Sequence, residues 1–110
     1  MKIIKRPWGG YVILKKMKNY WVKKLYVHPK ARLSLQSHHY REEVWYILQG
    51  MIIAQIGSKK HHGKEGDFFI IPKKKKHRII GVKKAVILEV AFGKTLETDI
   101  VRYEDDYGRA

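Results

Sequence analysis

Two histidines, a glutamate and a glutamine are spaced so that they could together bind a divalent metal ion. Gln36 and His38 lie two residues apart in an expected strand, so both side chains point to one face. Glu43 opens the next expected strand, and His77 follows much later, after Pro72 and four lysines. If a β-barrel brings these strands together, two imidazoles, a carboxylate and an amide oxygen form a site with open positions for water or substrate. Zinc, manganese, cobalt and nickel are all candidates for the ion.

Each of these residues also has a purely structural explanation. His38 and His77 could be buried histidines that hydrogen-bond to their neighbours. Glu43 could pair with Arg41 or with a lysine, because a buried carboxylate without a partner is costly. Gln36 is either a weak metal ligand or a contact to substrate. The remaining histidines are expected on the surface: His28, His39, His61 and His62.

The segments that must position these residues have the pattern of short β-strands. Apolar runs rich in Val, Ile, Tyr, Phe and Trp alternate with glycine-containing turns, and no stretch of ten or more residues keeps a helical period. This spacing predicts an all-β sandwich or barrel, built as one domain over residues 1–110 because the length leaves no room for two cores. The polar, acidic tail 95–110 either holds a short helix or lies over the barrel. The expected strands are 11–14, 20–27, 33–37, 44–48, 51–56, 68–71, 78–80 and 85–92.

The charge balance favours an anionic ligand. Lysine and arginine total 24 against 10 aspartate and glutamate residues, a formal net charge of +14. Such a field attracts nucleic acid, anionic membranes or phosphorylated small molecules. Nucleic acid is disfavoured, because only six of the basic residues are arginine and the lysines come mostly as pairs at expected turns, without interleaved aromatic residues.

The chain has no cysteine, which excludes disulfides, cysteine-bound zinc and a thiol nucleophile. This composition fits a cytoplasmic protein. No apolar stretch approaches the ~18 residues needed to span a bilayer, and the N-terminal residues are too short and polar a stretch for a secretory signal. We therefore expect a cytoplasmic chain with no membrane association.

The spacing of the candidate ligands resembles the two motifs of the cupin superfamily. The first motif reads Gly, five residues, His-x-His, three or four residues, Glu, six residues, Gly. This chain has Lys30, then ARLSL, Gln36-Ser37-His38, HYRE, Glu43, VWYILQ and Gly50. The second motif reads Gly, five residues, Pro-x-Gly-x-x-His, three residues, Asn, and here it runs from Gly66 through Pro72 and His77 to Gly81. The resemblance implies a single-domain cupin, a small jelly-roll-like β-barrel.

Three longer stretches narrow the resemblance. They are RPWGGY at 6–11, ARLSLQSHHYREEVW at 31–45 and DIVRYEDDYGR at 99–109. All three look like the cupin module of type II mannose-6-phosphate isomerases, which in that family usually follows a mannose-1-phosphate guanylyltransferase domain. The glutamine at position 36 belongs to the LSLQ pattern of that family. Tyr40 and Val44 depart from the family, which usually has histidine at both positions.

The resemblance implies a metal-dependent aldose–ketose isomerase that interconverts mannose 6-phosphate and fructose 6-phosphate, in the metabolism of GDP-mannose and polysaccharide precursors. The metal would be held by Gln36, His38, Glu43 and His77, and as a Lewis acid it would stabilise the enediolate. The base that moves the proton between C1 and C2 is Glu43 by first choice and Glu89 by second.

The phosphate group of such a substrate needs a basic site. Arg41, in the RxE element of the family, and Lys73 and Lys76, at the expected mouth of the barrel, would bind it. The alternative function is a non-catalytic module that binds a sugar phosphate or nucleotide sugar and associates with a guanylyltransferase. The absence of histidine at positions 40 and 44 favours this alternative.

Strand alternation predicts a homodimer. If Gln36 and His38 face inward, Leu33, Leu35 and Ser37 face outward. If Glu43, Trp45 and Ile47 face inward, the outward set is Val44, Tyr46 and Leu48. Two neighbouring strands would then expose an apolar outer face, which soluble monomers avoid. We expect a second copy of the chain to cover this face.

Overall fold

Nine β-strands and no helix make up the part of the chain that the computed structural model describes, residues 2–110. The all-β class expected from the sequence is therefore confirmed, and none of the described residues forms a helix that could span a membrane. Met1, the first residue of the expected single domain, lies outside the described residues. The strands are β1 (Ile4–Arg6), β2 (Gly9–Lys16), β3 (Tyr20–Val27), β4 (Leu35–Ser37), β5 (Arg41–Ile56), β6 (Lys59–Lys64), β7 (Phe68–Ile71), β8 (His77–Gly93) and β9 (Val101–Glu104).

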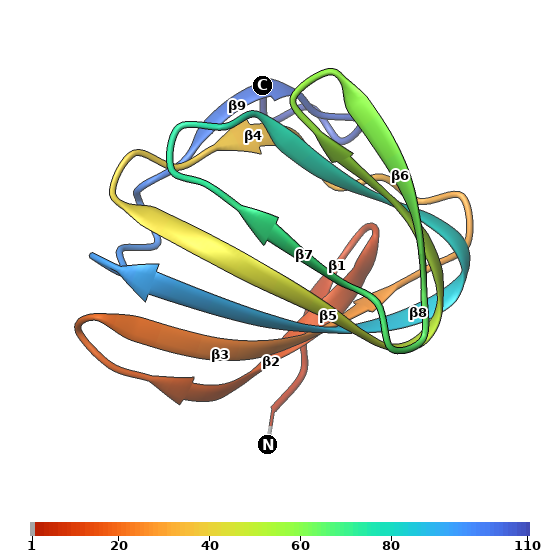
Figure 1. Cartoon of the computed structure of the whole chain (residues 1–110), viewed down its shortest axis with the longest axis horizontal. Helices are drawn as coiled ribbons and strands as arrows, with labels where there is room; N and C mark the ends of the chain where they lie inside the picture. The colour runs from red at the N-terminus through yellow and green to blue at the C-terminus, as the bar shows by residue number, and fades with distance from the viewer. Residues whose placement is uncertain (1) are drawn as a thin grey trace.

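The long strands β5 and β8 form the centre of one antiparallel, curled sheet. Along the sheet the strands follow the order β1-β2-β3-β8-β4-β9, and β5 pairs with β6, β7 and β8. Residues 85–92 of β8 pair with β3, whereas His77 at the other end of β8 pairs with Gln36 of β4. In Figure 1, β8 accordingly bends from the side of the molecule that holds β3 and β5 towards β4 and β9. This bend brings the ends of distant strands around one interior.

Irregularities in β5 allow the sheet to curl. The β5–β8 register shifts between Ile47 and Ile52, and bulges of this kind bend a strand and increase its twist. Gly50 lies in this stretch with a φ of 83°, and a Cβ atom there would collide with the carbonyl oxygen of Lys84. Only glycine fits this close approach of two backbones.

The apolar core fills one part of the interior and leaves another part polar. Strand β3 alternates strictly, with its inward positions buried, and bulky side chains such as Trp45, Ile52 and Ile87 pack together. Lys23 is also on an inward position of β3 and is buried, with its ammonium group 2.7 Å from Glu97 Oε1. The interior therefore changes from apolar to charged along the barrel, and the candidate site lies in the charged part.

Two expectations for the segment around β4 are wrong in detail. Leu33 is buried in the core rather than outward-facing, because β4 starts only at Leu35 and strand alternation does not extend back to position 33. Ser37 is buried as well, with its hydroxyl 2.9 Å from the hydroxyl of Tyr103. The tail forms no helix. It contributes β9, which pairs with β4, and Tyr103 of β9 covers Ser37, which strand alternation alone would expose to solvent.

Alternation correctly predicts an apolar outer face on β5, but the strand that extends this face is β7, because β4 pairs with β8 and β9 rather than with β5. Tyr46 is 42% exposed and pairs with Phe68, which is 62% exposed, and Ile70 beside them is 59% exposed. On the other side of β5, Val44 pairs with Val90 and Tyr46 with Leu88. Soluble monomers rarely expose a continuous apolar patch of this kind. A homodimer through this face stays a prediction.

The dimer prediction has a direct test. We expect light scattering to give about twice the monomer mass of 13.0 kDa, and the double variant Tyr46→Lys with Phe68→Lys to give the monomer mass, because like charges would meet across the two-fold axis. Val101→Lys is the matched control, since Val101 is 54% exposed but lies on β9. A wild-type monomer at micromolar concentration would contradict the prediction.

Candidate functional site

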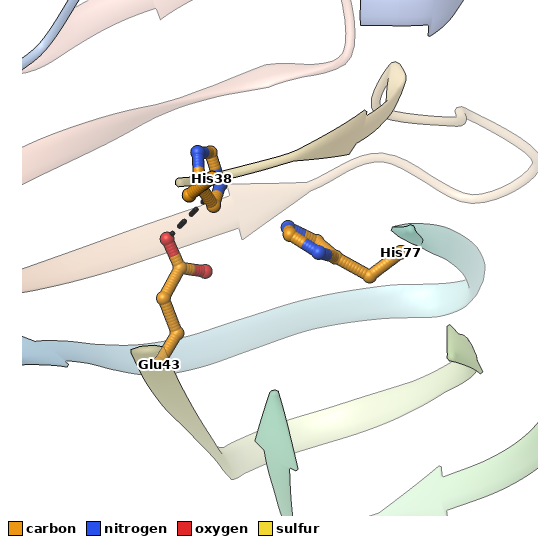
Figure 2. Close-up of side chains that lie close together, drawn as sticks. All are labelled: His38, Glu43 and His77. Carbon is orange, nitrogen blue, oxygen red and sulfur yellow. Dashed lines mark ion pairs between the residues drawn. The ribbon is translucent and has the colours of Figure 1, made fainter. Parts of the chain in front are cut away.

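His38, Glu43 and His77 converge in the interior, as the sequence predicts. His38 follows β4, Glu43 lies near the start of β5, and His77 opens β8. All three side chains are buried, and each offers a ligand atom within 4.8 Å of the others. Figure 2 shows the two imidazoles and the carboxylate pointing toward a common space. Gln36, the fourth expected ligand, pairs with His77 in the sheet and lines the adjoining cavity.

Backbone carbonyls set the tautomer of both histidines. His38 Nδ1 lies 2.7 Å from the carbonyl oxygen of Asp99, and His77 Nδ1 lies 2.9 Å from that of Lys75. A carbonyl oxygen only accepts hydrogen bonds, so each Nδ1 carries the proton and each Nε2 keeps a lone pair. Metal-binding histidines are typically oriented in this way.

The charge states in this cluster also suit a cation. Burial lowers the pKa of His38 to about 4 and lowers the pKa of His77, so both rings are neutral at pH 7. Burial alone would raise the pKa of Glu43, but the two imidazoles, the Arg41 guanidinium and the indole N–H of Trp45 lower it to about 2. Two neutral imidazoles and a carboxylate are the donors that zinc, manganese, cobalt and nickel accept. The three side chains therefore fit a divalent metal ion.

Arg41 is bonded to two of these candidate ligands. Its Nε donates to Glu43 Oε2 at 3.0 Å, and its Nη2 donates to His38 Nε2 at 3.2 Å. Its Nη1 donates to the carbonyl oxygens of Leu96 and Asp99. The pairing of Glu43 with Arg41, the structural alternative considered for this glutamate, is thus present. A metal ion and Arg41 compete for the same lone pair of His38.

Glu89 is the second carboxylate at the site. It lies on the inward face of β8 and accepts a hydrogen bond of 2.9 Å from the indole of Trp21. Burial, and next the negative charge of Glu43, raise the pKa of Glu89 to about 7, although Lys23 and Arg41 oppose the change. A carboxyl group with a pKa near the working pH is suited to both taking up and releasing a proton.

One cavity of about 150 Å³ adjoins these groups, room for several water molecules or a small polar ligand. The three stretches that carry the family resemblance, 6–11, 31–45 and 99–109, all reach it. They contribute Arg6, Trp8, Tyr11, Leu33, Ser34, Gln36, His38, Arg41, Glu43, Ile100, Arg102 and Arg109, while Lys23, Leu25, Glu89 and Glu97 complete the lining.

The two lysines expected to bind phosphate lie elsewhere. Lys73 and Lys76 are exposed on the loop between β7 and β8, and neither lines the cavity. The ammonium group of Lys76 lies over the ring of Tyr103, 4.2 Å from its centre. The prediction that these two lysines bind substrate is not supported by their position away from the cavity.

Sequence reasoning missed the basic residues that do line the cavity, Arg6, Lys23, Arg102 and Arg109. Three of them lie near the ends of the chain, far in sequence from the histidines and the glutamate. The sequence did contain a signal for the three arginines. They lie in RPWGGY and DIVRYEDDYGR, two of the stretches that carry the family resemblance.

A family model described as "Mannose-6-phosphate isomerase C-terminal" matches residues 1–105. The chain belongs to this family. Tyr40 and Val44, the two departures from its usual pattern, do not line the cavity. Tyr40 is largely exposed, and Val44 is partly buried on the opposite face of β5 from Glu43. The missing histidines therefore remove nothing from the lining of this cavity.

Several proteins of polysaccharide biosynthesis contain a region that is similar to this chain. It is 38% identical over 107 residues to the xanthan biosynthesis protein XanB of Xanthomonas campestris pv. campestris, which covers 94% of this chain and 23% of XanB. It is 39% identical over 107 residues to the alginate biosynthesis protein AlgA of Pseudomonas aeruginosa, which covers 94% of this chain and 22% of AlgA. The chain thus spans less than a quarter of the length of these relatives.

Solved structures support the fold. KdgF from Halomonas sp. matches with a TM-score of 0.77 at 14% identity, over 88% of this chain and 89% of KdgF. The nucleoside dehydratase Pac13 matches with a TM-score of 0.81 at 10% identity, over 94% of this chain and 85% of Pac13. A cupin domain of Schizosaccharomyces pombe Cnp3 matches with a TM-score of 0.71 at 19% identity, over 78% of this chain and 64% of that one. The fold is a cupin barrel, as expected from the sequence motifs.

Proposed function

We propose that this chain is a metal-dependent aldose–ketose isomerase that interconverts mannose 6-phosphate and fructose 6-phosphate. The observation that carries the proposal is a group of three side chains that fits a metal ion, His38, Glu43 and His77, beside a cavity that is also lined by a separate carboxylate, Glu89, with a pKa of about 7. Membership of the mannose-6-phosphate isomerase C-terminal family supports this choice of reaction.

The isomerisation moves two protons. The C2 proton of the open-chain aldose is taken up by a base, which gives an enediol, and a proton is delivered to C1 while another passes between O2 and O1. We assign the base to Glu89, whose ionised form is available near neutral pH. Glu43, the first choice on sequence alone, is a poor base, because its oxygens accept hydrogen bonds from Arg41 and Trp45 and its pKa is about 2.

The metal would be held by His38, Glu43 and His77, and Gln36, the fourth donor expected from the sequence, pairs with His77 in the sheet. When bound, a divalent ion at these residues supplies Lewis acidity that stabilises the negative charge on O1 and O2. Trp45 packs edge-on against His77, with ring centres 5.5 Å apart, and the backbone carbonyls hold both imidazoles. The protein thus orients the ligand atoms before an ion arrives, which favours one geometry.

The test is a coupled assay for fructose 6-phosphate formed from mannose 6-phosphate. We expect turnover with at least one of zinc, manganese, cobalt or nickel added, and none after treatment with a chelator, because the Lewis acid is then absent. The chelated sample with metal restored is the control for irreversible damage. Failure of all four metals would contradict the isomerase proposal.

A second function is favoured by the names of some relatives. Relatives of this chain include proteins named mannose-1-phosphate guanylyltransferase, such as ManC of Salmonella typhimurium, of which the chain covers 22%. A non-catalytic module that binds a sugar phosphate or nucleotide sugar and associates with a guanylyltransferase would retain the same cavity. Binding of mannose 6-phosphate without turnover in the assay above would favour this second function.

A further inference from the structure

Arg102 extends the row of inward side chains that contains the candidate metal ligands. It lies on β9 and pairs with Gln36 of β4, which in turn pairs with His77 of β8. Residues paired across strands share a face of the sheet, so Arg102 enters the interior on the same face as Gln36 and His77. It lines the cavity together with Gln36 and lies two strand spacings, roughly 10 Å, from the backbone of His77.

Arg102 is partly buried, and the Nε atom of its guanidinium is buried without a hydrogen-bond partner. Within residues 2–110, the buried side-chain nitrogens without a hydrogen-bond partner are Nε of Arg102 and Nη2 of Arg78. Arg78 is otherwise well bonded, with Nε donating to the carbonyl oxygen of Leu33 and Nη1 to Glu104. Arg102 makes no ion pair within the same residues. An unpaired buried donor is costly, so its position calls for a ligand.

Two further arginines on the cavity add positive charge beside Arg102. Burial lowers the pKa of Arg102, and the positive charges of Arg109 and Arg6 lower it further, so each of these two arginines repels Arg102. The one acidic group that opposes this effect, Asp105, is already bonded to Nε and the backbone N–H of Arg109. Asp105 therefore pairs with Arg109, and neither Arg102 nor Arg6 makes an ion pair within residues 2–110.

We propose that Arg102, assisted by Arg6 and Arg109, binds the phosphate group of the substrate. A guanidinium donates two parallel hydrogen bonds to phosphate oxygens, and a dianion would offset the repulsion that Arg109 and Arg6 exert on Arg102. The identity of the sugar rests on the proposed function, but the anion site stands on the arginines alone. The positions of the residues also fit. In a hexose 6-phosphate, carbons C3 to C6 lie between the phosphate and the reacting carbons C1 and C2. In the barrel, strand β4 lies between Arg102 and His77.

The experiment measures binding rather than turnover. Isothermal titration of the full chain with mannose 6-phosphate, inorganic phosphate and mannose is compared for the wild type, Arg102→Gln and Arg102→Lys. We expect Arg102→Gln to weaken mannose 6-phosphate and phosphate binding about ten- to hundredfold, the loss typical of charge-assisted hydrogen bonds. Arg102→Lys should bind with intermediate affinity, since it keeps the charge and loses the planar fork. Mannose binding should not change.

Lys73→Gln with Lys76→Gln is the matched control, because it removes two positive charges from the exposed loop near the site. We expect it to change phosphate affinity by less than about threefold, as surface charges do at moderate ionic strength. Thermal unfolding without ligand checks the fold: Arg102→Gln should be about as stable as the wild type, since Arg102 is only partly buried and makes no ion pair within residues 2–110.

The outcomes separate this inference from the isomerase proposal. Unchanged affinity in Arg102→Gln, or a larger loss in the lysine double variant, would overturn the assignment, and so would a wild type that binds no phosphate. If mannose 6-phosphate binds in an Arg102-dependent manner but is not isomerised, the anion site stands and the isomerase proposal falls.

Discussion

Replacement of Glu89 by glutamine is expected to lower the isomerase rate at least about a hundredfold, the usual contribution of a general base, while it makes the folded protein more stable at neutral pH. The rate falls because an amide cannot take up the C2 proton. Glutamine keeps the size of the side chain and an oxygen that accepts the hydrogen bond from Trp21. A loss of rate would therefore report on proton transfer rather than on packing.

The gain in stability follows from the raised pKa of Glu89. The ordinary pKa of 4.5 applies in the unfolded chain and about 7 in the folded protein, so between these values the folded state holds a proton that the unfolded state has released. Stability of the wild type therefore falls as pH rises from 4.5 to 7. Above pH 8 the loss is on the order of 3 kcal/mol, and Glu89→Gln should remove it. Thermal unfolding of the metal-free proteins at pH 5 and pH 8 measures the difference.

Glu97→Gln is the matched control with the opposite sign. Glu97 lines the same cavity, but its pKa is lowered: burial opposes the shift, while the hydrogen bond and charge of Lys23 and the charge of Lys16 produce it. A lowered pKa stabilises the folded state above the unfolded pKa and ceases to do so as pH falls. Glu97→Gln should thus lose a little stability at pH 8. Full activity of Glu89→Gln, or a stability gain that is the same at pH 5 and pH 8, would contradict our assignment of the base.

The sequence was sufficient to place the candidate metal ligands because their spacing encodes the topology. Gln36 and His38 share a face by strand alternation, and the distances to Glu43 and His77 match a motif whose strands converge in a barrel. The fold class followed from the same alternation and from the turns. Strand alternation is local in sequence, whereas the convergence of His77 with His38 and Glu43 was implied by the resemblance to the two cupin motifs, and both could be used without coordinates.

The chemistry of the two glutamates could not be ranked from the sequence. Both are acidic residues in apolar strands, and only the structure shows that Glu43 is bonded to Arg41 whereas Glu89 faces Trp21 and the charge of Glu43. The pKa of a buried carboxyl depends on such partners, and these partners come from strands far apart in sequence. For the same reason the lysines at 73–76 were predicted to bind phosphate and Arg102 was not. Consecutive lysines can be recognised in the sequence, whereas the placement of Arg102 on the cavity requires the structure.

Metal binding is tested by a comparison of the buried His77 with the exposed His39. His77→Gln should weaken binding of zinc or manganese at least about a hundredfold, since loss of a ligand exceeds the ten- to hundredfold cost of losing an outer partner. His39→Gln should bind the metal as the wild type does, because His39 is exposed and only its backbone N–H bonds to Asp99. Titration calorimetry of chelator-treated protein measures both. Equal affinity in the two variants would remove the metal from this site.

Arg41→Met tests whether Arg41 stabilises the folded protein when no metal ion is bound. The guanidinium of Arg41 neutralises the buried charge of Glu43 and caps His38 Nε2, so its removal leaves an unpaired buried carboxylate, a loss of about 3–5 kcal/mol without metal. The same removal frees the lone pair of His38, so metal affinity should rise. The melting temperature of Arg41→Met should therefore be lower than that of the wild type in chelator and recover more strongly when metal is added. If metal stabilises both proteins equally, Arg41 and the ion do not compete, and the ion binds away from His38 and Glu43.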